Sequence, residues 1–139
     1  MANTGYDWGA WAAVTKSGTG DWTALAISDN GNAGSTAISL DTKAACEVGF
    51  SLVEDNTGAI DGVVTAYVLG SIDGTNYEEM SPGQPWSFTV TPVINDTVGM
   101  RFNVDPAKYG DFKFWLLNEG GQTLATTVKY RTADIPVAS

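Results

Sequence analysis

The feature that most constrains this chain is a series of short apolar runs, each bounded by Gly, Pro, Asn or Asp residues. Within the longer runs, such as 44–53 and 97–104, apolar residues recur at every second position. A period of two residues is typical of a strand with one buried face. The sequence therefore predicts a domain built from strands. No segment has the period expected of a helix of three turns.

Eight segments of this kind follow one another along the chain. The predicted strands are 22–27, 35–40, 44–53, 63–69, 86–91, 97–104, 113–117 and 124–130. The segment 63–69 is apolar on both faces, which indicates a central strand. The last two segments flank the loop 118–122, which contains Gly120 and Gly121. We interpret them as a β-hairpin.

Regular spacing of short strands and turns predicts an all-β sandwich or barrel. Eight antiparallel strands favour a jelly-roll-like sandwich. An immunoglobulin-like sandwich is the alternative, but Cys46 is the only cysteine, so the paired cysteines of antibody-type domains are missing. We interpret Cys46 as a small buried apolar residue, since it lies in an apolar-patterned run.

The 139 residues suit one domain, which we divide into three parts. Residues 1–20 form an N-terminal arm, 21–131 the β-sandwich and 132–139 a polar C-terminal tail. The arm carries Tyr6, Trp8 and Trp11 among Gly, Ala and polar residues. Large aromatic side chains need a surface to bury against, either this domain's own core or a neighbouring subunit. We therefore predict these three residues as partner-binding residues.

Composition excludes several classes of function. The formal net charge is −9 and the pI is about 4.1, so phosphate backbones and anionic membranes would repel the chain. We expect neither nucleic-acid nor membrane binding. The first residues have neither a basic start nor an apolar stretch, and no run is long enough to span a bilayer. We expect a protein of the cytosol, or of a particle assembled there.

The chemistry-bearing residues predict no enzyme. The chain has no histidine, which removes the usual general base and the Ser-His-Asp arrangement. One cysteine without histidine allows no Cys/His metal site, and there is no P-loop motif. Glu47, in the middle of a predicted strand, is the best candidate for a carboxylate-dependent glycosidase. We expect no catalytic residue, cofactor or metal ion.

Two acidic loops and several aromatic residues leave alternatives open. The loops 29–32 and 54–57 gather oxygen ligands, but neither has the spacing of an EF-hand, and we interpret both as turns. A carbohydrate-binding module is the main alternative function. It would present flat aromatic rings to sugars, and the candidates are Trp86, Trp115, Tyr67 and Tyr130.

One segment resembles a known class of proteins. Residues 67–78 read YVLGSIDGTNYE, a strand that runs into an S-x-D-G-x-N-Y-E loop. This resembles a pattern seen in small virion proteins of tailed phages, including proteins encoded near the major capsid gene. The matching positions are Asp73, Gly74 and Tyr77, to which we assign a structural role in the turn.

The resemblance implies a capsid decoration (cement) protein. Such a protein is a β-rich clasp on the capsid exterior, often dimeric or trimeric, that reinforces contacts between capsomers. Its partners would be the major capsid protein or other virion subunits, and it would be assembled into the virion in the host cytoplasm. The alternative is a carbohydrate-binding or receptor-binding module of a phage tail or fibre. No catalytic residues are implied.

Overall fold

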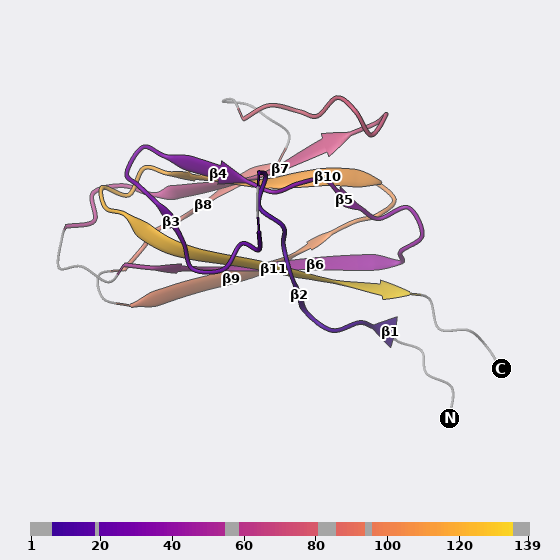
Figure 1. Ribbon diagram of the computed structural model, residues 1–139, viewed down its shortest axis with the longest axis horizontal. Coiled ribbons are helices and arrows are strands. Elements are labelled where there is room, and N and C mark those ends of the chain that lie inside the picture. Colours follow the sequence, from indigo (N-terminus) through magenta and orange to yellow (C-terminus); the bar gives the residue numbers. More distant parts are fainter. Residues whose placement is uncertain (1–6, 19, 55–58, 81–85, 94–95, 135–139) are drawn as a thin grey trace.

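A computed structural model describes residues 7–18, 20–54, 59–80, 86–93 and 96–134. In these ranges the chain forms strands and no helix, and Figure 1 shows the strands stacked as two layers. The strands are β1 (Asp7–Trp8), β2 (Ala12–Ala13), β3 (Leu25–Ile27), β4 (Asn32–Gly34), β5 (Ile38–Ser39), β6 (Ala45–Val53), β7 (Val64–Ser71), β8 (Ser87–Val90), β9 (Thr97–Val104), β10 (Asp111–Asn118) and β11 (Leu124–Asp134).

The two sheets have the strand order of a jelly roll. One sheet has the order β1-β11-β6-β9, with β2 and β3 also paired to β11. The other has the order β4-β10-β7-β8, with β5 also paired to β10. All pairs are antiparallel. The chain crosses from sheet to sheet as two Greek keys require. The predicted antiparallel sandwich is confirmed, and its order is not that of an immunoglobulin domain.

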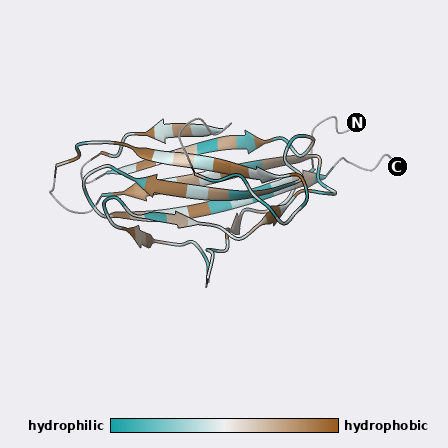
Figure 2. Ribbon diagram, turned by 90° about the horizontal axis from the view of Figure 1, so that it is seen from above, coloured by the Kyte–Doolittle hydropathy of each residue, from teal (hydrophilic) through white to brown (hydrophobic). Residues whose placement is uncertain are grey.

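The long strands form where the sequence alternates. The segment predicted as 97–104 is β9, and those predicted as 44–53 and 63–69 are β6 and β7 with small changes at their ends. Figure 2 shows the result as alternating brown and teal bands along the strands. The segment 35–40 is less regular than predicted. Ser35 interrupts it, because its hydroxyl accepts a hydrogen bond from the Phe114 N–H at 2.9 Å and separates β4 from β5.

The predicted hairpin between the last two strands is wrong. β10 pairs with β4, β5 and β7, whereas β11 pairs with strands of the other sheet, so the loop 118–122 arches between the layers. The buried side chain of Asn118 holds this arch. Its Nδ2 donates to the carbonyl oxygens of Ile27 and Gln122, and its Oδ1 accepts from the Gly120 N–H. Main-chain bonds to neighbouring loops add to this, since Gly120 O accepts from the Asp61 N–H and the Glu119 N–H donates to Val63 O.

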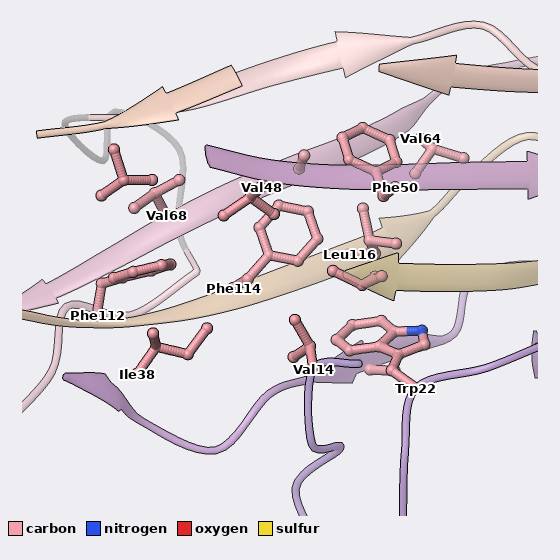
Figure 3. Packing of buried hydrophobic residues seen from close by; sticks show 14 of the residues in the cluster. Val14, Trp22, Ile38, Val48, Phe50, Val64, Val68, Phe112, Phe114 and Leu116 are labelled. Atoms are coloured by element: carbon pink, nitrogen blue, oxygen red, sulfur yellow. The ribbon is translucent and has the colours of Figure 1, made fainter. Parts of the chain in front are cut away.

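The core lies between the sheets and is rich in aromatic rings. The ring centroids of Phe50 and Phe114 are 5.5 Å apart, and those of Trp22 and Phe114 are 6.0 Å apart. Figure 3 shows these rings in one cluster with aliphatic side chains. The indole Nε1 of fully buried Trp22 donates to the Thr126 hydroxyl at 2.8 Å, so burial leaves this polar atom satisfied. Cys46 is 1% exposed, which confirms its interpretation as a buried apolar residue.

Two predicted boundaries differ from the sheet that forms. The segment 1–20, predicted as an arm, contains β1 and β2, and both pair with β11. The segment 132–139, predicted as a tail, begins inside β11, which continues to Asp134. Both segments therefore contribute to the sandwich in their described parts. No helix in the described ranges is long and apolar enough to cross a membrane.

Candidate functional site

The outer face of the β11-β6-β9 sheet carries three cross-strand rows of side chains. The register aligns Arg131 with Glu47 and Asn103, then Lys129 with Gly49 and Arg101, then Thr127 with Ser51 and Gly99. Residues in such rows lie side by side because opposite positions in neighbouring strands point to the same face. The first row contains an ion pair and an asparagine, the second is basic at both ends, and the third has only small side chains. The face is therefore graded from large side chains to small ones.

The small residues leave a groove on this face. Its volume is about 550 Å³, which is within the range of small-molecule sites. The groove is lined by Trp11, Gly49, Phe50, Ser51, Gly99, Met100, Arg101, Thr127 and Lys129. The two glycines and two hydroxyl residues form its floor, since none of them extends far from the sheet.

Trp11 forms a wall of this groove. A Cβ on Gly49 would lie 3.5 Å from two ring carbons of Trp11, so the indole rests directly over the missing side chain. The Arg131 guanidinium carbon is 4.9 Å from the ring centroid of Trp11 and 4.5 Å from that of Trp8. Arg131 Nε in turn donates to Glu47 Oε1 at 2.9 Å, and Nη2 forms an ion pair with the same oxygen at 2.8 Å. This chain of contacts fixes the orientation of the wall.

The groove carries positive charge, whereas the whole chain is acidic. Seven cationic residues stand against sixteen acidic ones in the sequence, yet Arg101, Lys129 and Arg131 all lie on this one face. Arg131 is engaged by Glu47. The Arg101 side chain is 67% exposed, and its Nε lies 3.9 Å from the other Glu47 oxygen. Arg101 and Lys129 therefore leave cationic groups at the groove for a ligand.

A second surface is the edge of the sandwich where β8 and β9 lie. In the described chain, β9 pairs only with β6, and β8 pairs only with β7. Apolar side chains between these two strands are half-buried, and Phe88 and Phe102 stack edge-to-face with centroids 5.0 Å apart. We call this surface the open edge: Trp86, Phe88, Val98, Met100 and Phe102. The opposite edge differs, since β1, β2 and β3 cover β11.

The loop that carries the resemblance is held by its own side chains. Asp73 accepts hydrogen bonds from the main-chain N–H groups of Thr75 and Asn76 and from the Asn76 amide. These bonds keep the pKa of Asp73 well below its usual range. Gly74 has a φ of 74°, which favours glycine. The predicted turn role of Asp73 and Gly74 is confirmed. The loop presents Ile72 fully to solvent, with a relative exposure of 106%.

Tyr77 and Glu78 attach this loop to the sandwich. Lys113 Nζ lies 4.5 Å from the ring centroid of Tyr77, and Glu78 Oε1 accepts from the Gly70 N–H at 2.9 Å. Burial, with a contribution from Asp111 and Asp73, raises the pKa of Tyr77. The loop therefore covers part of the outer face of β7 and β10. This explains why β7 is buried on both faces, as its sequence indicates.

The predicted site residues fall on different surfaces. Trp8 and Trp11 lie together over Arg131 on their own sheet, while Tyr6 lies outside the described residues. Glu47 is held by Arg131. The loop residue Asp29 accepts a hydrogen bond from the Gly121 N–H, and residues 55–57 of the other acidic loop lie outside the described ranges. Among the residues described, no three Asp, Glu or Cys side chains gather as a metal site would require.

The aromatic residues considered for sugar binding do not form a platform. Tyr67 is only 9% exposed, Trp86 and Tyr130 pack against the core, and Trp115 lies over Gly34. Trp11, which was assigned to protein contacts, is the ring that borders a groove. Sequence pattern could not reveal this, because the register of β2 on β11 places it there. No protein-family model and no curated protein matches the chain.

Proposed function

We propose that the protein is a non-enzymatic structural component of a tailed-phage particle, a decoration protein that binds and stabilises the outer surface of the head shell. The observation that carries the proposal is the open edge. β9 is eight residues long, contains no proline, and has Arg101 as its only charged residue. Natural sheets protect long edge strands of this kind or use them to pair with a partner.

The proposed contact is strand addition. A strand of a shell subunit would pair with the free main-chain groups of β9, which gives affinity without a deep pocket. Half-buried Val98, Met100 and Phe102 would then lose their remaining contact with water, which adds apolar stabilisation. A rigid domain loses little entropy on docking, and many copies on one shell would multiply a modest contact.

Two further features agree with a role in assembly. The segment 67–78 resembles small virion proteins of tailed phages, and its loop presents Ile72 to solvent on a turn fixed by hydrogen bonds. Preorganised loops with an exposed apolar residue lose little entropy when they dock. The jelly roll itself is used by viral coat domains and by lectins, so the fold alone does not decide between these roles. The resemblance also implies a dimer or trimer.

Carbohydrate binding, the alternative function, would use a different surface, the groove beside Trp11. Decoration therefore depends mainly on the open edge, and carbohydrate binding depends on the groove. The glycosidase alternative has little support, because the carboxylate of Glu47 is held by a hydrogen bond and an ion pair from Arg131.

The experiment that tests decoration uses tailed-phage heads from which the outer decoration protein is missing. Heads are mixed with the purified chain and separated on a density gradient, and the bound copies are counted. We expect saturation at a fixed number of copies per shell subunit. Val98→Lys, at the open edge, should lower the affinity at least about tenfold, which corresponds to about 1.4 kcal/mol.

Thr97→Lys is the matched control, because it adds the same charge to the same strand on the exposed outer face. It should leave occupancy unchanged. Circular dichroism of both variants checks that the sandwich is intact. The proposal fails if the chain binds no such heads, or if the two lysine variants bind equally well. Light scattering of the chain alone measures the expected dimer or trimer.

A further inference from the structure

We propose that the groove on the outer face of β11, β6 and β9 binds an anionic sugar, whose ring stacks against Trp11 and whose acidic group is held by Arg101 and Lys129. The acidic group is a carboxylate or a phosphate, which share the same chemistry toward these cations. This inference goes beyond head decoration and does not depend on it. Met100 belongs to both surfaces, but Val98, the open-edge residue that tests decoration, does not line the groove.

The shape of the groove suits a sugar ring beside an aromatic wall. Arg131 lies in the row on one side of Trp11, and the small row of Ser51, Gly99 and Thr127 lies on the other. One side of the indole is thus occupied by the guanidinium, and the other borders open space. The face of an aromatic ring is electronegative, so it attracts the polarised C–H groups on the flat side of a pyranose.

The floor of the groove lets a ring approach the sheet closely. Trp11 lies over Gly49, so the open part of the floor is at Gly99, which has no side chain. The nearest atom to a Cβ built on Gly99 is the Phe50 carbonyl oxygen at 3.5 Å. The hydroxyl groups of Ser51 and Thr127 line the same groove and offer donors and acceptors to sugar hydroxyls. This combination of an apolar wall with a few polar groups is typical of small-molecule sites.

The charge of the groove selects an acidic sugar over a neutral one. Lys129 and Arg101 stand at the two ends of one cross-strand row, with Gly49 between them. Charge-assisted hydrogen bonds from lysine or arginine to a carboxylate or phosphate are about twice as strong as neutral ones. The chain carries a net charge of −9, so the protein as a whole repels anions, whereas Arg101 and Lys129 attract an anion to this face.

The wall is preorganised before any ligand arrives. β2 pairs with β11 at Ala12 and Tyr130, which holds the main chain next to Trp11. Stacking on Arg131 then fixes the indole, and the Arg131–Glu47 pair, with Glu47 only 15% exposed, fixes the guanidinium. A site that is already ordered loses less entropy on binding.

The test is isothermal titration with four sugar probes, 3′-sialyllactose, trigalacturonate, glucose 6-phosphate and neutral lactose, and with inorganic phosphate as the anion without a sugar. We expect at least one acidic probe to bind at least tenfold more tightly than lactose, and its affinity to fall as salt increases. The double variant R101Q/K129Q should weaken that affinity at least tenfold. A matched control, Lys108→Gln, removes a cation that does not line the groove and should change nothing.

Two variants test the floor of the groove and its Trp11 wall separately. Gly99→Leu fills the floor of the groove and keeps Trp11, and it should abolish binding, whereas Trp11→Ala should abolish the preference for a sugar over inorganic phosphate. Tighter binding by the carboxylate probes than by glucose 6-phosphate identifies a uronic or sialic acid as the ligand, and the reverse identifies a sugar phosphate. The inference is overturned if no acidic probe binds at millimolar concentration, if lactose binds equally well, or if Gly99→Leu binds like the parent chain.

Discussion

At the scale of single residues, Gly34 shows how closely the outer face of the second sheet is packed. The Trp115 ring lies over Gly34, and its Nε1 donates to Asn32 Oδ1 at 2.9 Å, which holds the ring in place. A Cβ on Gly34 would overlap the carbons of this ring. We expect Gly34→Ala to lower the free energy of unfolding by about 1–3 kcal/mol, the usual effect of overpacking, in urea titrations.

Gly99→Ala is the control for this prediction. Both glycines lie in strands, but a Cβ on Gly99 meets its nearest neighbour at 3.5 Å, an ordinary contact. Its effect on stability should stay within about 0.5 kcal/mol. Equal losses in the two variants would mean that the Trp115 contact does not constrain Gly34.

The raised pKa of the Cys46 thiol predicts how the free energy of unfolding changes in alkaline solution. Burial, with a smaller contribution from Glu47, raises the pKa of its thiol from 9.0 to about 12. The unfolded chain therefore loses this proton at lower pH than the folded chain. Stability from this residue is intact below pH 9 and declines as pH rises toward 12. The folded thiol should also resist alkylation at pH 8 and react after unfolding in urea.

The measurement compares the parent chain with Cys46→Ala. Burial also raises the pKa of Tyr77 and of Tyr109, and both variants share these tyrosines, so their contributions cancel in the difference. Between pH 8 and pH 10 the parent chain should lose about 1 kcal/mol more than Cys46→Ala. Parallel pH profiles would contradict the buried, neutral thiol.

At the scale of elements, Arg131 connects the N-terminal strands to the body of the sheet. It contacts both indoles of the segment 1–20 and pairs with Glu47. Replacing it with methionine keeps an apolar stem but removes the charge. We expect Arg131→Met to cost about 1–3 kcal/mol and to speed amide exchange in β1 and β2 selectively. Hydrogen exchange with mass spectrometry measures this.

Lys43→Met is the matched control, because Lys43 also forms an ion pair with a residue of β11. Its Nζ lies 3.4 Å from Asp134 Oδ1, but the Asp134 side chain is 62% exposed. An exposed pair contributes about 0–1 kcal/mol, so this variant should exchange like the parent chain. Faster exchange of β1 and β2 in both variants would show that general charge loss, and not stacking, is responsible.

The hydrogen bonds of Asn118 lead to a second prediction at this scale, which concerns the arch between β10 and β11. Its side chain is buried and satisfies two carbonyl oxygens and one N–H. Asn118→Ala leaves these groups buried without partners, and we expect a loss of about 2–4 kcal/mol in thermal or urea unfolding. Asn32→Ala, the control, removes a single exposed hydrogen bond. An equal loss of stability in this variant would argue against the role of Asn118 in holding the arch.

The same arch shows where sequence reasoning succeeds and where it stops. Alternation predicted β6, β7 and β9 because a strand with one buried face, or two, has a local signature in composition and period. The loop 118–122 has the glycines of a hairpin, but the sheet that each flanking strand joins is decided by distant partners such as β6 and β7. The turn was therefore recognised, whereas its type was predicted wrongly.

The candidate site was less predictable than the fold. The sequence predicts Trp8 and Trp11 as partner-binding rings, and that role stays a prediction. It does not predict where they lie, because alternation in a two-residue strand is too short to give a register. Their place over Arg131 and Gly49 depends on pairing with β11, more than 100 positions away in the sequence. The cationic row of Lys129, Gly49 and Arg101 likewise exists only after three strands align.

At the scale of the whole molecule, the two edges of the first sheet are treated in opposite ways. β11 is covered along its length by β1, β2 and β3, whereas β9 has no strand on its outer side in the described chain. The N-terminal strands therefore close the β11 edge of this sheet and leave the β9 edge available for pairing. The groove and the open edge are then adjacent surfaces that meet at Met100 of β9.

This asymmetry predicts what the N-terminal segment does. Deletion of residues 1–13 removes β1 and β2 and uncovers the main-chain groups of β11 from Lys129 to Asp134, while β9 and the open edge stay as they are. An uncovered, long edge strand promotes edge-to-edge association. We therefore expect the truncated chain to form larger oligomers than the full chain in sedimentation velocity, at equal concentration and pH. Adding Val98→Lys to the truncated chain should not prevent this, because Val98 lies at the other edge. If that substitution restores the size of the full chain, the new contact forms through β9, and the N-terminal strands do not act by covering β11.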